Sequence, residues 1–233
     1  MQRRIEEYSL REFIQFKIIT IGDAGVGKTS FLKRYTENVF EPDVKPTIGI
    51  DVLVKKLLIK NEPIQLSFYD TAGTERYASI SDSYFKGASM CIIMYDVTRK
   101  STFISCERWL TKLQSIIEDN ITIIIIGNKT DNIQEREVSE EEGKTFAQKN
   151  KCYFIETSCL NGSNVNEAID IVITHGVTDT LITSLKSSQI GKITPTKPLV
   201  DSYSVDNQNG YSTSNSSTTI QSTTSNQSNC CPM

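Results

Sequence analysis

The sequence has a single histidine, His175, among its 233 residues, and none of its six cysteines has the spacing of zinc ligands. A catalytic triad with a histidine base and a metal centre built on several histidines are therefore excluded. Four of the cysteines lie in segments with strand or helix patterns, where small buried apolar side chains are expected: Cys91, Cys106, Cys152 and Cys159. Any catalysis has to rest on other groups.

Neither a strong charge of one sign nor a long hydrophobic run is present. The formal net charge is −3, from 25 basic and 28 acidic residues, so no general attraction to nucleic acid or acidic lipid is expected. The longest apolar run, around Ile123 to Ile126, is far too short to cross a bilayer and predicts a buried strand. The first 13 residues carry charges throughout, so we expect no secretory signal, a cytoplasmic protein and reduced thiols.

The clearest motif is the glycine-rich stretch GDAGVGKTS, which follows the apolar segment QFKIITI. It matches the phosphate-binding pattern G-x-x-x-x-G-K-[ST], which a chain of this length meets by chance with a probability on the order of 1%. Glycines let main-chain N–H groups approach a polyphosphate, the lysine supplies a positive charge, and the threonine supplies a Mg²⁺ ligand. The predicted phosphate-binding residues are Gly22, Asp23, Ala24, Gly25, Val26, Gly27, Lys28, Thr29 and Ser30.

Strand-like and helix-like segments alternate along the chain. Apolar patterns predict strands at residues 15–21, 51–59, 64–69, 90–97, 121–127 and 152–156. Helices are predicted at residues 28–37, 101–118, 139–150 and from 164 onward, and the expected N-caps of the last three are Ser101, Ser139 and Asn164. This alternation predicts an α/β fold with a six-stranded, mostly parallel sheet, one antiparallel edge strand and helices on both faces.

A second motif, GNKTD, directly follows the run Ile123 to Ile126 of the strand predicted at residues 121–127 and indicates guanine recognition. The carboxylate of Asp131 can accept hydrogen bonds from both the ring N–H and the exocyclic amine of guanine, a pair that adenine does not present. Asn128 is expected to hold neighbouring loops together, and the stem of Lys129 to cover the base plane. The motif argues against the competing interpretation, a P-loop ATPase or a nucleotide kinase.

With these motifs the chain resembles the Ras-like small GTPases and, within them, the Rab family, over about residues 12–184. The matching stretches are GDAGVGKTS, PTIGID, YDTAGTERY, YFKGA, YDVT, GNKTD, REVSEEEG and ETSCLNGSNVNEA. The resemblance implies a P-loop NTPase fold of the Ras-like type, with an N-terminal extension (1–12), a GTP-binding domain (13–184) and a tail (185–233). Of the last 33 residues, 22 are Ser, Thr, Asn or Gln, so the tail is predicted to be a disordered tether.

The resemblance also implies roles for single residues. Thr47 resembles the threonine that binds Mg²⁺ and the γ-phosphate, and Asp70 resembles the aspartate that holds Mg²⁺ through water. Gly73 resembles the glycine whose N–H touches the γ-phosphate, and Phe40 the aromatic that stacks on the guanine edge. Main-chain N–H groups near the guanine oxygen are implied for Thr157, Ser158 and Cys159. The implied catalytic positions are Lys28, Thr47, Gly73 and Thr74, and the implied metal ligands are Thr29, Thr47 and Asp70.

Thr74 departs from the family, which has glutamine directly after DTAG to orient the attacking water. Threonine is shorter and lacks the amide, so intrinsic hydrolysis slower than the roughly 3 to 5 × 10⁻⁴ s⁻¹ of a Ras-type site is predicted. Two alternatives stay open: an activating protein that supplies the missing groups, and a mostly GTP-bound scaffold that recruits effectors. Val52 and Tyr69 replace the usual Phe and Trp of the effector-facing cluster, so the usual subfamilies do not predict the effectors.

The sequence ends in CCPM and has no Lys or Arg after Lys197. Cys230 and Cys231 resemble the double-cysteine ends of Rabs, which predicts two geranylgeranyl groups; one farnesyl group or free thiols are the alternatives. A single lipid chain anchors only marginally without a basic patch, which favours two. The resemblance further implies a monomer that cycles between cytosol and membrane in vesicle traffic. The implied partners are an exchange factor, a GTPase-activating protein, a GDP-dissociation inhibitor, escort and prenylation proteins, and effectors.

Overall fold

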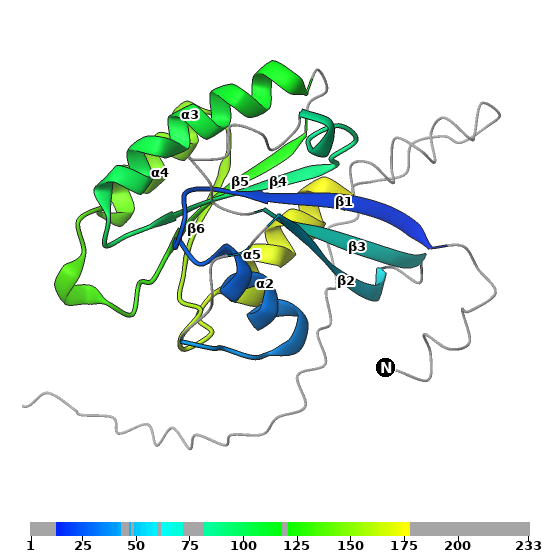
Figure 1. Ribbon diagram of the computed structural model, residues 1–233, viewed down its shortest axis with the longest axis horizontal. Helices are drawn as coiled ribbons and strands as arrows, with labels where there is room; N and C mark the ends of the chain where they lie inside the picture. The colour runs from blue at the N-terminus through cyan, green and yellow to red at the C-terminus, as the bar shows by residue number, and fades with distance from the viewer. Residues whose placement is uncertain are drawn as a thin grey trace, which may run out of the picture. The chain divides into compact units, whose positions relative to one another are not determined.

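The structure is a computed structural model that describes residues 13–42, 47, 49–59, 62–71, 82–117 and 121–177 (Figure 1). All of these residues fall within one compact unit, Met1–Gly191. The predicted N-terminal extension and the predicted tail lie outside the described residues, so both stay predictions. Among the described residues, no helix combines the length and the apolar character that crossing a membrane requires.

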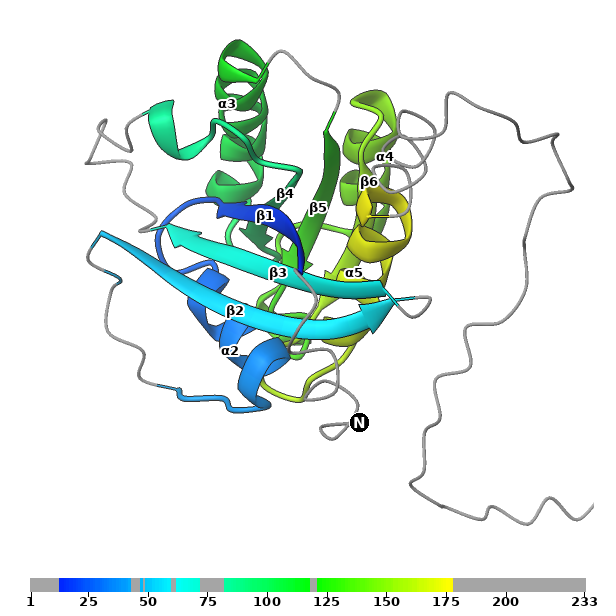
Figure 2. The ribbon, with the colours of Figure 1, turned by 90° about the vertical axis from the view of Figure 1, so that its right-hand side faces the viewer.

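A six-stranded sheet forms the centre of this unit, with the strand order β2-β3-β1-β4-β5-β6. Its strands are β1 (Ile14–Ile21), β2 (Ile50–Ile59), β3 (Glu62–Thr71), β4 (Met90–Asp96), β5 (Thr122–Asn128) and β6 (Tyr153–Thr157). β2 runs antiparallel to β3, as the opposed cyan arrows of Figure 2 show, and the other pairs are parallel. The predicted mostly parallel sheet with one antiparallel edge strand is confirmed.

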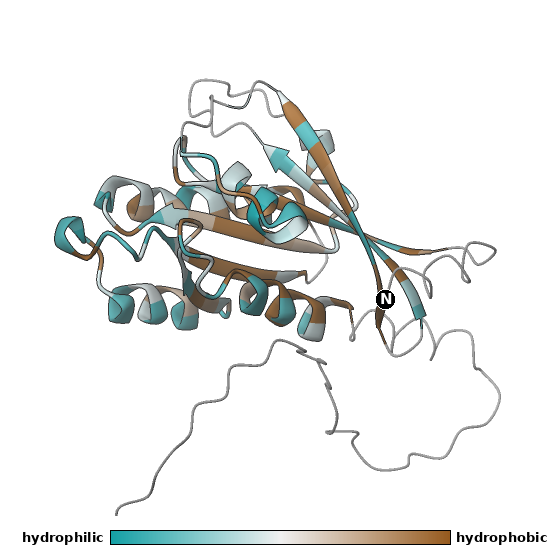
Figure 3. Ribbon diagram, turned by 90° about the horizontal axis from the view of Figure 1, so that it is seen from below, coloured by the Kyte–Doolittle hydropathy of each residue, from teal (hydrophilic) through white to brown (hydrophobic). Residues whose placement is uncertain are grey.

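Helices cover both faces of the sheet, as predicted (Figure 1). They are α2 (Lys28–Glu37), α3 (Lys100–Ile116), α4 (Glu140–Lys149) and α5 (Val165–Val172), with short 3-10 turns at Asp82–Tyr84 and Ile133–Glu135 and a π turn at Ile173–Val177. Side chains of α2 and α5 share one apolar cluster with the sheet, and those of α3 and α4 share the other. Ile18 and Ile19 of β1 belong to different clusters, because successive strand residues point to opposite faces. Figure 3 shows the hydrophobic colouring of the central strands between helices of mixed colouring.

Two of the three residues predicted as N-caps do occupy N-cap positions in the structure. The capping box of α4 is confirmed, because the Glu142 amide donates to Ser139 Oγ at 3.3 Å and the Ser139 amide donates to Glu142 Oε2 at 2.9 Å. Asn164 does occupy the N-cap of α5, but its φ is 57° and its side chain makes no cap. Its side-chain Nδ2 instead donates to the carbonyl of Glu156 at 2.8 Å, which joins the start of α5 to β6.

The predicted cap at Ser101 is wrong. Helix α3 already begins at Lys100, and Arg99 occupies the N-cap position without a side-chain cap. The hydroxyl of Thr102 explains the earlier start, since it accepts from the Asp96 amide at 3.0 Å and donates to the Arg99 carbonyl at 2.7 Å. These bonds tie the first turn of α3 to the end of β4, so the turn does not need Ser101.

Candidate nucleotide-binding site

The glycine-rich loop, residues 22–27, connects the end of β1 to the start of α2, as the motif requires. Gly22 has a φ of 141° and Gly27 a φ of 97°, both in the region that favours glycine. A Cβ on Gly22 would lie 2.2 Å from the Met94 carbonyl oxygen, and a Cβ on Gly27 would lie 2.3 Å from Asn128 Nδ2. The loop thus packs its bare main chain against β4 and β5, which only glycine permits at these two positions.

Lys28, the first residue of α2, is buried. Its ammonium donates to the carbonyls of Gly22 and Asp23, each at 2.9 Å. The positive charge is therefore held against the main chain of the loop, beside the N-terminus of a helix. Both features favour an anion at this point.

Three oxygen-bearing side chains from different segments meet beside the loop: Thr29 of α2, Thr47 before β2, and Asp70 of β3. Thr29 Oγ1 donates to Asp70 Oδ2 at 2.5 Å and lies 2.8 Å from Thr47 Oγ1. Asp70 is fully buried, and its Oδ1 has no hydrogen-bond partner among the described residues. Burial raises the pKa of Asp70, against hydrogen bonds from Thr29 and Thr47 and the charge of Lys28. A hard divalent cation fits this set, because it binds hydroxyl and carboxylate oxygens and would give the unpartnered oxygen a positive neighbour.

On the other side of the loop, Asn128 occupies the end of β5 with 1% of its surface exposed. Its Nδ2 donates to the Val26 carbonyl at 2.8 Å, and its Oδ1 accepts from Thr157 Oγ1 at 3.2 Å and from Cys159 Sγ at 3.3 Å. Burial raises the pKa of the Cys159 thiol to about 11, so the thiol keeps its proton and acts as a donor at neutral pH. Asn128 holds neighbouring loops together, which is the geometry expected for it.

Asp131 and Lys129 also have partners from neighbouring segments. The Ser158 hydroxyl donates to Asp131 Oδ1 in a very short hydrogen bond. Lys129 has a φ of 71°, and its ammonium lies 2.7 Å from Asp96 Oδ2 at the end of β4. The predicted guanine-recognition residues at and after the ends of β5 and β6 are thus bonded across the two loops in pairs, and Lys129 is bonded to the end of β4.

Sequence reasoning gave no role to Asp96, which is fully buried and holds two cations. In addition to Lys129, the Arg99 Nε donates to Asp96 Oδ2 at 3.0 Å, and Arg99 Nη2 donates to the Ala24 carbonyl at 3.1 Å. Burial alone would raise the pKa of Asp96, but hydrogen bonds from Lys129 and Thr98 lower it below its ordinary value. Asp96 therefore links the base-recognition loop to the phosphate loop as a carboxylate.

The sequence pattern assigned Trp109 to core packing, and the side chain does lie in the core of α3 with 6% of its surface exposed. It has a second contact that helical periodicity cannot reveal. The indole Nε1 donates to Asp23 Oδ1 of the phosphate loop at 2.8 Å, and Arg108 Nη2 lies 3.3 Å from the same oxygen. Helix α3 thus supports the phosphate loop from the side.

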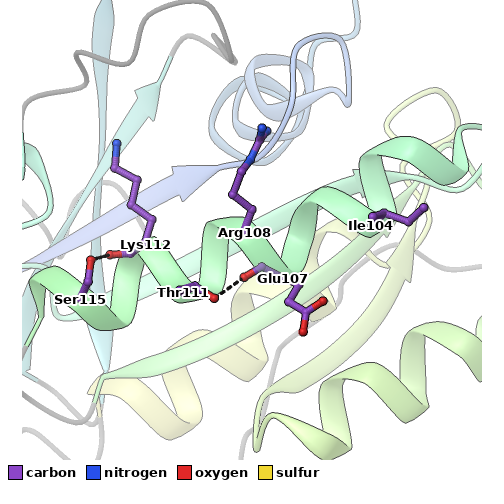
Figure 4. Close-up of a pocket in the computed structure, with 6 residues that line it drawn as sticks. All are labelled: Ile104, Glu107, Arg108, Thr111, Lys112 and Ser115. Carbon is purple, nitrogen blue, oxygen red and sulfur yellow. Dashed lines mark hydrogen bonds between the residues drawn. The ribbon is translucent and has the colours of Figure 1, made fainter.

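A shallow pocket lies on the outer surface of α3, and Arg108, which contacts Asp23, is one of its lining residues (Figure 4). It is lined by Ile104, Glu107, Arg108, Thr111, Lys112 and Ser115. Arg108 is the only lining residue with a contact to the glycine-rich loop among those described above, and no predicted nucleotide-binding residue lines the pocket. We therefore assign the nucleotide site to the loops at the ends of the strands and not to this pocket.

Within the described part of the chain, Phe40 makes no hydrogen bond or ion pair with the phosphate loop or the metal-binding set. Phe40 is half-buried and packs against the apolar cluster that α2 and α5 share, with its ring centroid 5.9 Å from the guanidinium carbon of Arg34. Gly73 and Thr74 lie outside the described residues, as do Cys230 and Cys231. Their roles stay predictions.

Residues 17–177 match the sequence model of the Ras family. The chain belongs to the Ras family. It is 43% identical over 160 residues to the GTP-binding protein ypt3 of Schizosaccharomyces pombe, which covers 69% of this chain and 75% of that protein. It is 44% identical to the Ras-related protein Rab11E of Lotus japonicus (69% and 73% covered) and 42% identical to Rab-11C of Dictyostelium discoideum (68% and 71% covered).

These relatives identify this Ras-family chain as a small GTPase of the Rab type. The predicted family and the Ras-like fold are confirmed, and GTP hydrolysis is the activity of the family. The competing interpretation, a P-loop ATPase or a nucleotide kinase, finds no support in these matches.

Proposed function

We propose that this small GTPase binds GTP and GDP together with Mg²⁺ through residues 13–184 and acts as a nucleotide-dependent switch in vesicle traffic. One observation carries the proposal: Asn128, from the guanine-recognition motif, donates to the Val26 carbonyl of the phosphate loop at 2.8 Å. This bond brings the base-recognition motif into direct contact with the phosphate loop, as the binding of one nucleotide by both motifs would require. The relatives named as GTP-binding and Ras-related proteins support the same reading.

In this proposal Asp131 accepts the ring N–H and the exocyclic amine of guanine, and the Ser158 hydroxyl keeps the carboxylate in place. Lys28 exchanges its bonds to loop carbonyls for phosphate oxygens. Thr29, Thr47 and Asp70 would hold Mg²⁺, the last through water. A cation bound there would neutralise part of the charge of the phosphates.

Competition for the site tests this proposal directly. In the presence of Mg²⁺, we expect GTP and GDP to displace a fluorescent GDP analogue from the full chain. ATP is expected not to displace it even at a roughly thousandfold excess, because a site built to hydrogen-bond one base rejects a base that lacks those groups. Equal displacement by ATP would contradict the assignment of Asp131. If GDP competes and ATP does not, but the affinity for GDP is the same with and without Mg²⁺, only the assignment of the metal ligands is contradicted.

The switch follows from where the terminal phosphate is bound. Thr47 and Gly73 attach two segments of the chain to the γ-phosphate, so its removal on hydrolysis releases both segments. Effectors sense the nucleotide through their preference for one of the two states. The exchange factor, the activating protein and the GDP-dissociation inhibitor act on the same equilibrium.

Thr74 makes intrinsic hydrolysis slow, because it lacks the amide that orients water in glutamine-containing members. Single-turnover phosphate release is expected to be faster in Thr74→Gln than in the wild type, and equal rates would contradict the prediction. The same residue favours a second candidate, an effector-recruiting scaffold that stays GTP-bound. An activating protein that accelerates the wild type to the rate of Thr74→Gln would exclude the scaffold.

Membrane attachment rests on Cys230 and Cys231. Two geranylgeranyl groups suffice without the basic patch that a single lipid needs. Mass spectrometry of the C-terminal peptide from eukaryotic cells distinguishes two geranylgeranyl groups, one farnesyl group and free thiols by mass. Replacing both cysteines by serine is expected to move a fluorescent fusion from the cytosolic face of a membrane into the cytosol.

A further inference from the structure

Arg34 of α2 connects the helix that follows the phosphate loop to the loop that follows β6. Its Nε donates to the Cys159 carbonyl at 2.9 Å, and its Nη2 donates to the Leu160 carbonyl at 2.6 Å. Two successive peptide groups, more than a hundred positions away in sequence, are thus held by one guanidinium. Arg34 Nη1 also lies 3.3 Å from the Asn38 carbonyl at the C-cap of its own helix.

The same guanidinium reaches a third part of the proposed site. Its central carbon lies 5.9 Å from the ring centroid of Phe40, within the range of a cation–π contact. Phe40 follows α2 along the chain and is the residue predicted to stack on the guanine edge. Arg34 therefore contacts both the loop that contains Cys159 and the aromatic ring, although neither motif contains it.

We propose that Arg34 is a positioning residue for guanine binding, an inference that rests on the proposed function. By binding the carbonyls of Cys159 and Leu160, it fixes the main chain at the end of the segment Thr157, Ser158 and Cys159, whose N–H groups are expected near the guanine oxygen. Hydrogen bonds from a charged donor are stronger than neutral ones, and the planar guanidinium suits two adjacent acceptors. A lysine has no such fork, so it can replace the charge but not the geometry.

Release of two nucleotides that differ only at the guanine oxygen tests this inference. In 6-thio-GDP, sulfur replaces that oxygen and accepts hydrogen bonds poorly, so the wild type is expected to release it faster than GDP. In Arg34→Gln, GDP release is expected to be about tenfold faster, as the loss of one or two charged hydrogen bonds predicts. The ratio between the two nucleotides should shrink, because the displaced loop no longer distinguishes oxygen from sulfur. The rate of GDP release from Arg34→Lys should lie between the rates of the wild type and of Arg34→Gln.

Lys33→Ala is the matched control, since Lys33 is the neighbouring residue of α2 and its ammonium pairs with Glu41 at 3.1 Å on the surface. We expect wild-type release of both nucleotides from this variant. Unchanged GDP release from Arg34→Gln would overturn the inference, and so would faster release of both nucleotides by the same factor, which indicates general loosening. Should Arg34→Gln not fold, the ratio measured for Arg34→Lys decides by the same criteria. Failure of the wild type to bind GDP would overturn the proposed function itself, before any variant is compared.

Discussion

The base side and the phosphate side of the site differ in how their buried polar groups are bonded. On the base side, Asn128 has protein partners at both ends of its amide, and Asp131 is held by Ser158. On the phosphate side, the hydroxyl of Thr29 bonds to Asp70, while the other carboxylate oxygen of Asp70 is buried without a partner among the described residues. The base-side groups named here thus bond to other parts of the protein, whereas one buried oxygen of the phosphate side has no such bond among the described residues.

This difference predicts which residues stabilise the fold without a ligand and which act mainly when a ligand is bound. A buried polar atom without a partner costs about 1–3 kcal/mol, and a bound cation removes that cost. Residues of the base side should therefore stabilise the fold whether or not nucleotide is present. Residues of the phosphate side should contribute mainly through the metal and the nucleotide.

The largest effect on the fold is expected from Asn128→Ala. The change removes the bond to Val26, leaves the buried Thr157 hydroxyl without its acceptor and takes the nearer acceptor from the Cys159 thiol, so we expect the free energy of unfolding to fall by about 3 kcal/mol. Denaturant unfolding without added nucleotide measures it. Asn132→Ala is the control, because the Asn132 amide bonds Glu135 on the surface and a change of less than about 0.5 kcal/mol is expected. An equal loss in both variants would contradict a self-supporting base side.

Asp70→Asn should weaken the dependence on Mg²⁺ without weakening the fold, which is the opposite of what we expect for Asn128→Ala. In the wild type, Mg²⁺ is expected to slow GDP release, and in the variant this effect should weaken by about tenfold because the charge that attracts the cation is gone. Without metal, the variant should be at least as stable as the wild type, since a buried carboxylate has been replaced by a neutral group of similar shape. GDP release at several Mg²⁺ concentrations and metal-free unfolding are the measurements.

The matched control for Asp70→Asn is Asp51→Asn. Asp51 is exposed and lies opposite Asp70 in the β2–β3 register. This variant removes the same charge from the neighbouring strand but no oxygen of the Thr29, Thr47 and Asp70 set, so it should keep most of the Mg²⁺ effect although the charge of Asp51 also acts on Asp70. A weaker metal-free fold in Asp70→Asn would show that the phosphate side is as self-sufficient as the base side.

Trp109→Phe should affect the phosphate side alone and more weakly. Phenylalanine keeps an aromatic ring in the core but loses the N–H that donates to Asp23. The loss of one hydrogen bond of about 1 kcal/mol predicts GDP release about fivefold faster. Discrimination between GDP and inosine diphosphate, which lacks the exocyclic amine, should not change. Arg108→Ala should have a smaller effect, because the Arg108 side chain is 61% exposed.

The strands of the sheet and the positions of the two motifs at the strand ends could be predicted from the sequence, and the reasons are physical. Apolar periodicity is local, and the phosphate loop needs glycine at positions where any side chain would collide with β4 or β5. The contacts of Arg34 and Trp109 could not be predicted, because both residues fit ordinary helix patterns and their polar atoms reach partners distant in sequence. The Ser101 cap failed for a related reason, since the Thr102 hydroxyl made a bond that the local pattern does not encode.

The smallest effect is expected at the capping box of α4, where Glu142 contacts none of the predicted nucleotide-binding residues. The Ser139 amide and hydroxyl and the Lys100 ammonium lower the pKa of Glu142 to about 2 from 4.5. Because the folded-state pKa is the lower one, the carboxylate stabilises the fold above pH 4.5, and this stabilisation is lost as the pH falls toward 2. Glu142→Gln should thus unfold more easily than the wild type at pH 7, and the difference should narrow below pH 4.5.

Denaturant unfolding at a series of pH values measures this difference, and Glu141→Gln is its control because it removes a charge from the same turn but keeps the capping box. A difference for Glu142→Gln that does not change with pH would contradict the assigned cause. GDP release from both variants should equal that of the wild type. A faster release from Glu142→Gln would mean that the contact of Glu142 with Lys100, at the start of α3, reaches the nucleotide site. In that case the division into a base side and a phosphate side would have to include α3 as a whole, and not only Trp109 and Arg108.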